Sequence, residues 1–210
     1  MVLVSAFKDG YAALRANPIL LVAGLLVGGG SQLQNVEHLI DSPLVSAGAS
    51  LAWLIVFPFV LGGFIETARA AIEGTDTSVT QFLTAARTHY LRLLLGTVVF
   101  VLVVLGTAIG LGLVGFILGI GSMALAAIHE MAAFAAGVGS LLVWLLSILV
   151  IIMFVQFYDV AIVIEDQSVT DSFRRSVALV RSNLKSVVGF SLVWVILLNA
   201  FFIPEYLLQL

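Results

Sequence analysis

The stretch between Arg92 and Asp159 constrains this chain more than any other feature. It covers positions 93–158, 66 residues, and Glu130 is its one charged residue. A membrane-spanning helix needs about 20 apolar residues, so the stretch is long enough to cross a bilayer more than once. Soluble domains carry about 25% charged residues, whereas this chain carries 10%. The sequence therefore predicts an integral membrane protein.

The rest of the chain has the same character. Hydrophobic residues make up 61% of its 210 positions, and the mean hydropathy is +1.19. The net charge of −3 offers no basic field that would attract nucleic acid. Cysteine is absent, which excludes disulfides, thiolate catalysis and iron–sulfur ligation. The N-terminus does not have the pattern of a cleaved signal peptide.

Apolar runs and polar turns predict an all-α, polytopic transmembrane bundle that forms a single transmembrane domain over residues 1–210. Asn17-Pro18 ends a first amphipathic segment, because the residue before proline avoids the helical region. Ser78 has the side chain of a helix N-cap. We expect five membrane helices, at 19–33, 44–72, 91–123, 132–164 and 187–203, and three amphipathic interfacial helices, at 1–17, 78–90 and 168–186.

Basic residues predict the orientation, because they gather on the cytoplasmic side of membrane proteins. With five crossings, all nine fall on one side; three crossings between Arg92 and Asp159 would instead place the Arg174 loop outside. We therefore expect a multi-pass protein of the cell membrane, with a cytoplasmic N-terminus and an outside C-terminus. The nine are Lys8, Arg15, Arg69, Arg87, Arg92, Arg174, Arg175, Arg181 and Lys185.

The chain also repeats itself. Residues 64–66 (Phe-Ile-Glu) resemble residues 157–159 (Phe-Tyr-Asp), and the Ser-Val-Thr of 78–80 recurs at 168–170. Two crossings separate the copies, which predicts parallel repeats about an axis along the membrane normal. The N-terminal amphipathic helix and the helix after it look like a weaker third copy. Three such units would have six membrane helices, so we expect the sixth to be truncated or supplied by another subunit.

Residues 159–189 resemble a pattern from uncharacterised prokaryotic membrane families. The pattern is an acidic turn, Ser168-Val169-x-Asp171-Ser172-x-x-Arg175-Ser176, then a basic helix and a glycine-bearing membrane helix. It is similar to the membrane domain found beside glycerophosphodiester phosphodiesterases and to UPF0259-type inner-membrane proteins, with an archaeal branch as the nearest resemblance. This resemblance implies a six-helix bundle with interfacial helices. It implies no established activity, because the phosphodiesterase catalytic domain is absent.

Three charged residues near the predicted inner membrane face are candidates for a site. Glu66 and Asp159 occupy equivalent repeat positions, and ionisable groups inside a membrane need a partner or water. Arg69 lies three residues after Glu66 on the same helix face and could pair with it; Arg174, Arg175 or Arg181 could serve Asp159. These acids form either a proton- or ion-sensitive inner vestibule or salt bridges that hold surface helices to the bundle. We favour the salt bridges.

The last amphipathic segment is the most basic of the three. Arg174, Arg175, Arg181 and Lys185 could contact anionic lipid headgroups, at about 1 kcal/mol per basic residue near the surface. The alternative is that this charge only sets the topology.

Other motifs predict no chemistry. Gly110-x-Gly112-x-x-Gly115 has the dinucleotide-binding spacing, but it lies inside an expected membrane helix rather than between a strand and a helix. His129-Glu130 lacks the second histidine of a zinc-protease motif. It could meet the Glu37-His38 pair outside the membrane, but two histidines and two acids in solvated turns are a weak indication of a metal. We expect no catalytic residues, no metal and no cofactor.

These observations favour a non-catalytic membrane protein that organises lipid or a partner protein. The alternative is a small, oligomeric transporter or channel that uses Glu66 and Asp159. The expected partners are membrane lipids, and a second copy or another membrane subunit that supplies a sixth helix; nucleic acid is excluded.

Overall fold

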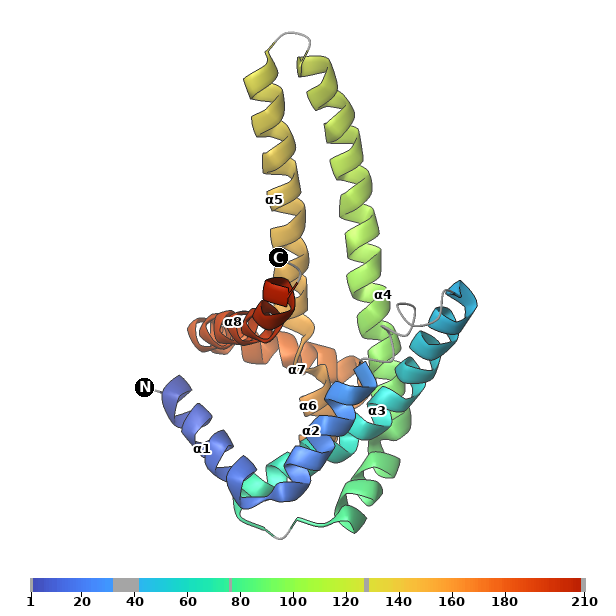
Figure 1. The fold of residues 1–210 in the computed structure, drawn as a ribbon, viewed down its shortest axis with the longest axis vertical. Coiled ribbons are helices and arrows are strands. Elements are labelled where there is room, and N and C mark those ends of the chain that lie inside the picture. Colours follow the sequence, from blue (N-terminus) through green and yellow to red (C-terminus); the bar gives the residue numbers. More distant parts are fainter. Residues whose placement is uncertain (1, 32–41, 76, 127–128, 209–210) are drawn as a thin grey trace. The chain divides into compact units, whose positions relative to one another are not determined.

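The computed structural model describes residues 2–31, 42–75, 77–126 and 129–208, and this part of the chain is helical. Helix accounts for 92%, and no strand occurs within these ranges. The prediction of an all-α chain is confirmed for them. The helices in chain order are α1 (Val2–Ala16), α2 (Pro18–Ser31), α3 (Pro43–Glu73), α4 (Val79–Ala126), α5 (Glu130–Val155), α6 (Tyr158–Ile164), α7 (Val169–Ser182) and α8 (Leu184–Leu208) (Figure 1).

Three to five of these segments are long and apolar enough to cross a membrane. Three qualify by themselves: Pro43–Glu73, Val79–Met123 and Glu130–Ile164. Two more qualify if each sharply bent helix pair counts as one span: Val4–Ala16 with Pro18–Gly30, and Val169–Ser182 with Leu184–Ile196. The five crossings of the sequence analysis are the upper end of this range. The apolar helices indicate a membrane-embedded protein.

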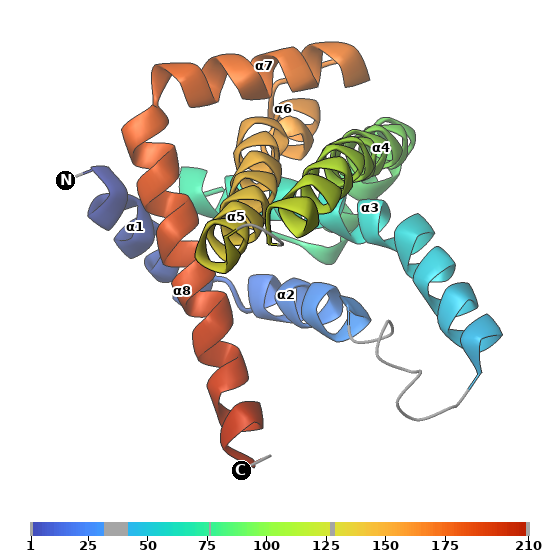
Figure 2. The same ribbon diagram turned by 90° about the horizontal axis from the view of Figure 1, so that it is seen from above.

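The bends occur where the sequence offers a cap or a proline. α1 and α2 meet at 102°, and Asn17 at the corner donates to the Ala13 carbonyl and accepts from Thr77 Oγ1. α7 and α8 meet at 100° (Figure 2), and the N–H of Asn183 caps α7 by donating to its last carbonyls. α4 shows no such bend between the segments expected at 78–90 and 91–123. Residues 79–95 contain neither glycine nor proline, so nothing interrupts the helical hydrogen bonds.

The chain forms two compact units. One is Val98–Gln156, which consists of the later part of α4 and of α5. Its helices are joined by a hydrogen bond from Trp144 Nε1 to the Ala108 carbonyl, at 3.1 Å. None of the side chains described between 98 and 154 is buried. Because most of them are apolar, this unit needs an apolar environment such as lipid around it. That residues 1–210 make one transmembrane domain stays a prediction.

The other unit contains Met1–Thr97 and Phe157–Leu210, and α3 lies at its centre. α3 packs against α1, α2 and α6. A small core joins α2, α3 and α4 through Ala23, Val60 and Phe82. Phe7 of α1 and Phe190 of α8 stack with their ring centroids 6.4 Å apart. The start of α4 therefore belongs to this unit, next to the turns that carry most of the charges.

The span expected at 132–164 corresponds to Glu130–Ile164, and within it the regular helix breaks between α5 and α6. Its two residues between the helices are Gln156 and Phe157. The backbone N–H of Phe157 donates to Ser176 Oγ of α7, at 3.1 Å, instead of to a carbonyl of its own helix. A side chain that replaces a helical hydrogen bond in this way is an ordinary cause of a helix break.

Tyr158, at the start of α6, packs against a glycine of α4. Its hydroxyl lies 3.0 Å from Thr97 Oγ1, and its ring stacks on Phe173 with centroids 4.9 Å apart. A Cβ atom at Gly96 would lie 2.8 Å from the Tyr158 ring. This ring is held on both sides and 5% exposed, so it cannot move away easily. Only glycine at position 96 permits this approach.

We expect Gly96→Ala to destabilise the protein, because its methyl group overlaps the Tyr158 ring. Gly106→Ala on the same helix is the control, since no atom lies within 4 Å of its Cβ position. Both changes gain the same helix propensity, so their difference isolates the overlap. Gly96→Ala should have the lower free energy of unfolding, by about 1–3 kcal/mol. Denaturation by dodecyl sulfate in mixed micelles measures this, and equal stabilities would contradict it.

Candidate functional site

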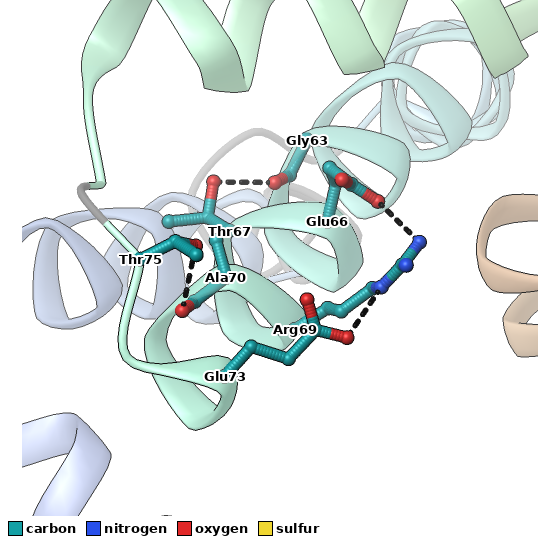
Figure 3. A network of polar contacts seen from close by, with 7 residues as sticks. All are labelled: Gly63, Glu66, Thr67, Arg69, Ala70, Glu73 and Thr75. Carbon is teal, nitrogen blue, oxygen red and sulfur yellow. Dashed lines mark hydrogen bonds and ion pairs between the residues drawn. The ribbon is translucent and has the colours of Figure 1, made fainter.

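The predicted contact between Glu66 and Arg69 exists, but a third residue dominates it. Arg69 Nε donates to Glu73 Oε1 at 2.9 Å, whereas its Nη1 lies 3.8 Å from Glu66 Oε2. Figure 3 shows the Arg69 guanidinium between the two carboxylates, one turn of α3 on either side. Thr67, on the buried side of α3, donates to the Gly63 carbonyl at 2.8 Å. Arg69 is therefore mainly the partner of Glu73, and Glu66 is compensated only weakly.

Asp159 is not part of this network. It lies in the first turn of α6, where its Oδ1 accepts from the N–H of Val160 at 2.8 Å. Two of its suggested arginine partners pair elsewhere: Arg174 with Asp171 at 3.4 Å, and Arg175 with Glu165 at 2.7 Å. Among the ion pairs of the described residues, none includes Asp159. The two repeat-related acids thus have different surroundings, because Glu66 lies within α3 whereas Asp159 lies in the first turn of α6.

The salt bridge that ties α7 to the bundle is formed by Glu165 and Arg175. Arg175 donates from Nε and Nη2 to both carboxylate oxygens of Glu165, at 2.7–2.9 Å. This bidentate hydrogen bonding lowers the pKa of Glu165 below its usual value, since it favours the charged carboxylate. Ser172 and Ser176 lie on the buried face of α7. Both partners of the salt bridge are partly exposed, so packing contributes more to the attachment of α7 than the ion pair does.

A second link joins α4 to the turn between α6 and α7. Arg92 donates to a side-chain oxygen of Asp166 and to the backbone carbonyls of Asp166 and Gln167. Asp166 has φ 52°, a left-handed conformation that aspartate tolerates better than most residues. From the sequence, Arg92 was expected only to mark the topology. A signal was available: Thr80, Thr84, Thr88 and Arg92 recur every four residues and so share one face of α4.

That face of α4 lines a cavity of about 480 Å³. Its other walls come from α3 and from the end of α6 with the following turn. Ser78, which begins α4 as its N-cap by accepting from the Gln81 N–H at 3.1 Å, lies at the rim of the same cavity, so the expected cap is confirmed. Most of the lining residues are polar or charged, although their apolar atoms contribute much of its surface; they include Glu66, Arg69, Thr80, Thr84, Thr88, His89 and Asp166.

One face of α7 forms a second surface feature of similar size. Arg174 and Arg181 lie seven residues, or two helical turns, apart on this face. Phe173, Val177 and Ala178 add an apolar floor, and the five residues line a groove of about 500 Å³. The side chain of Arg174 is 77% exposed. Arginines thus flank an apolar surface on one helix, a feature that we call the α7 groove.

The remaining motifs have structural positions. Gly110, Gly112 and Gly115 lie inside α4, without the strand that a dinucleotide site requires. His129 is the N-cap of α5, and its Nδ1 accepts from the Ala132 N–H at 3.2 Å. Glu37 and His38 lie outside the described residues. Within the described ranges, no three His, Asp or Glu side chains lie close enough together to hold a metal ion.

Comparison with known proteins identifies a family. Residues 1–210 match the family described as a domain of unknown function, DUF7847. The match covers the whole chain, so the protein belongs to that family. No curated protein and no solved structure matches the chain.

We expect Arg175→Gln to loosen α7, because it removes the bidentate contact with Glu165. The pair is partly exposed, so the effect should be modest: amide exchange in residues 169–182 should accelerate by about fivefold at most. Arg174→Gln is the matched control, since Arg174 makes one long contact within its own helix. Hydrogen–deuterium exchange of the protein in nanodiscs measures both, and equal acceleration in the two variants would refute the assignment.

The same contact should respond to acid. The pKa of Glu165 is lower in the folded protein than in the unfolded chain, so the contact stabilises above the unfolded value and is lost as the pH falls through the folded one. Exchange in residues 169–182 should therefore become faster on acidification, after correction for the intrinsic exchange rate. Arg175→Gln should abolish this dependence. A dependence that persists in the variant would show that another group is responsible.

Proposed function

We propose that this member of the family is a non-catalytic protein of the cell membrane that gathers anionic lipid on its cytoplasmic side through α7. The observation that carries the proposal is the α7 groove, which combines an apolar floor with a cation at each end. A lipid has the matching form, because its phosphate is anionic and its glycerol and upper acyl chain are apolar. A purely topological role for the basic residues would not require this floor.

The angle at the end of α7 supports the proposal. If α8 crosses the membrane, the 100° bend at Asn183 lays α7 along the bilayer surface. Its buried residues, including Ser176 and Val180, face the bundle, whereas Arg174, Ala178 and Arg181 of the groove are exposed. A surface helix that presents apolar and basic groups together is typical of interfacial binding.

The four basic residues suggested for lipid contact are not equivalent. Arg175 is occupied by Glu165. Arg181 and Lys185 are exposed, and Lys185 begins α8 at the same corner. Arg174 is exposed and only loosely paired. We therefore assign the lipid contact to Arg174, Arg181 and Lys185, and a structural role to Arg175.

We also propose that the N-terminus is cytoplasmic and that the chain contains parallel internal repeats. Two similarities between the repeat copies support the repeats. Ser78 and Ser168 both accept from the N–H three residues later, and Gly74 and Asp166 both have positive φ in the preceding turns. We also retain the relation to the membrane domains found beside glycerophosphodiester phosphodiesterases, and a sixth helix from a second copy or another subunit, as parts of this proposal.

A small transporter or channel is the second candidate. The cavity beside Glu66 favours it, because an acid in a polar cavity at the membrane edge could bind a substrate. Asp159 is not among the lining residues of that cavity. Flux through proteoliposomes that Glu66→Gln abolishes and Asp159→Asn leaves unchanged would favour this candidate.

We expect the double variant Arg181→Gln, Lys185→Gln to bind anionic lipid more weakly. At about 1 kcal/mol per basic residue, the affinity should fall about 30-fold. Native mass spectrometry of protein released from nanodiscs of phosphatidylglycerol and phosphatidylcholine reports the retained lipid. Arg87→Gln, which removes an exposed charge from α4, is the control. Unchanged retention in the double variant, or an equal loss in Arg87→Gln, would refute the assignment to α7.

A further inference from the structure

The cavity between α3, α4 and the end of α6 lies outside the α7 groove and has an unusual balance of polar groups. Arg69, which lines it, and Arg92, which lies beside its lining residue Asp166, are already occupied. Arg69 lies between two carboxylates, and Arg92, at the next turn of the threonine face, donates to Asp166 and to two backbone carbonyls. An anion entering this cavity would have to displace one of these contacts.

The acceptors of the cavity, in contrast, have capacity left. Glu66 is 26% exposed, and its one ion pair with a described residue is the 3.8 Å approach of Arg69, which binds Glu73 more closely. Thr84 and Thr88 each donate their single hydroxyl hydrogen to a carbonyl of α4, at 2.8 and 2.9 Å. Their oxygens can therefore only accept further hydrogen bonds.

A third group adds to this imbalance. His89 lines the cavity, and its Nδ1 is buried without a hydrogen-bond partner among the described residues. With the proton on Nε2, this nitrogen is also an acceptor that lacks a donor. Buried polar atoms are rarely left without a partner. The wall of the cavity thus offers the hydroxyl oxygens of Thr84 and Thr88 and one weakly compensated negative charge, and a buried acceptor lies behind it.

We propose that this cavity binds a primary ammonium group, with Glu66 as its counter-ion and the hydroxyl oxygens of Thr84 and Thr88 as acceptors. An ammonium group supplies three N–H donors and a positive charge, which is what the lining lacks. The group can belong to an ethanolamine lipid headgroup or to a soluble amine, since Ser78 and Asp166 place the cavity next to the turns that end the bundle. A quaternary ammonium, as in choline, has the charge but no N–H donor.

The test uses the full chain in two kinds of nanodisc. In one, phosphatidylcholine discs contain a minor share of phosphatidylethanolamine, and native mass spectrometry reports which lipid is retained. In the other, discs of phosphatidylcholine alone are titrated with ethanolamine or choline by calorimetry. The first identifies a lipid source and the second a soluble one. In at least one of the two experiments, we expect the ethanolamine compound to bind more tightly than the choline compound. Glu66→Gln should weaken the binding of the ethanolamine compound about tenfold or more.

Two further variants decide whether the ligand is positively or negatively charged. Arg69→Gln removes the cation that competes for Glu66, so amine binding should strengthen; a site for an anion would lose its ligand instead. Glu130→Gln, the same chemical change on α5, should have no effect. If Glu66→Gln fails to fold, Arg69→Gln alone decides. Equal binding of ethanolamine and choline compounds, unchanged binding in Glu66→Gln, or weaker binding in Arg69→Gln would each overturn the proposal.

Discussion

The peptide groups of this chain must find their hydrogen-bond partners inside the chain wherever lipid surrounds it, because lipid offers none. Continuous helix meets this requirement, and it explains why even the most exposed unit, Val98–Gln156, forms helices although none of its side chains described between 98 and 154 is buried. Where helices end or break, polar side chains replace the missing partners. Ser78 and Ser168 cap helix starts, Asn183 caps the end of α7, and Ser176 receives the Phe157 N–H. The folded course of the chain depends on these few groups.

Ion pairs act on this frame as local links rather than as its main support. The three systems, centred on Arg69, Arg92 and Arg175, are all at least partly exposed. Pairs of this kind contribute about 0–1 kcal/mol each. Their greater effect is on ligand binding, because a charged side chain that is paired within the bundle is no longer free to bind a ligand. Arg175 is paired in this way, whereas Arg174 and Arg181 can still bind lipid. Glu66 can still accept hydrogen bonds, because the neighbouring Arg69 binds Glu73 more closely.

The candidate site was only partly predictable. The three-residue spacing of Glu66 and Arg69 predicted their contact correctly, because the partners share one helix. The role of Glu73 as the stronger partner follows from side-chain geometry that spacing does not specify. The suggested arginines for Asp159 pair with Asp171 and Glu165 instead. A charge near several opposite charges cannot be assigned a partner until the turns that carry them are placed, and the left-handed Asp166 in that turn was not foreseen.

The sequence by itself determined that the chain is helical and suited to a membrane, since composition and the length of apolar runs decide both. It also determined the break at Asn17-Pro18, which is a local feature, whereas the corner expected between residues 186 and 187 lies at Asn183. Only the tertiary structure decided that the Phe157 N–H donates to Ser176 at the break before Tyr158, and that the threonine face of α4 meets Glu66 and Asp166. These depend on contacts between residues far apart in the chain, and local periodicity contains no information about which helix faces will meet.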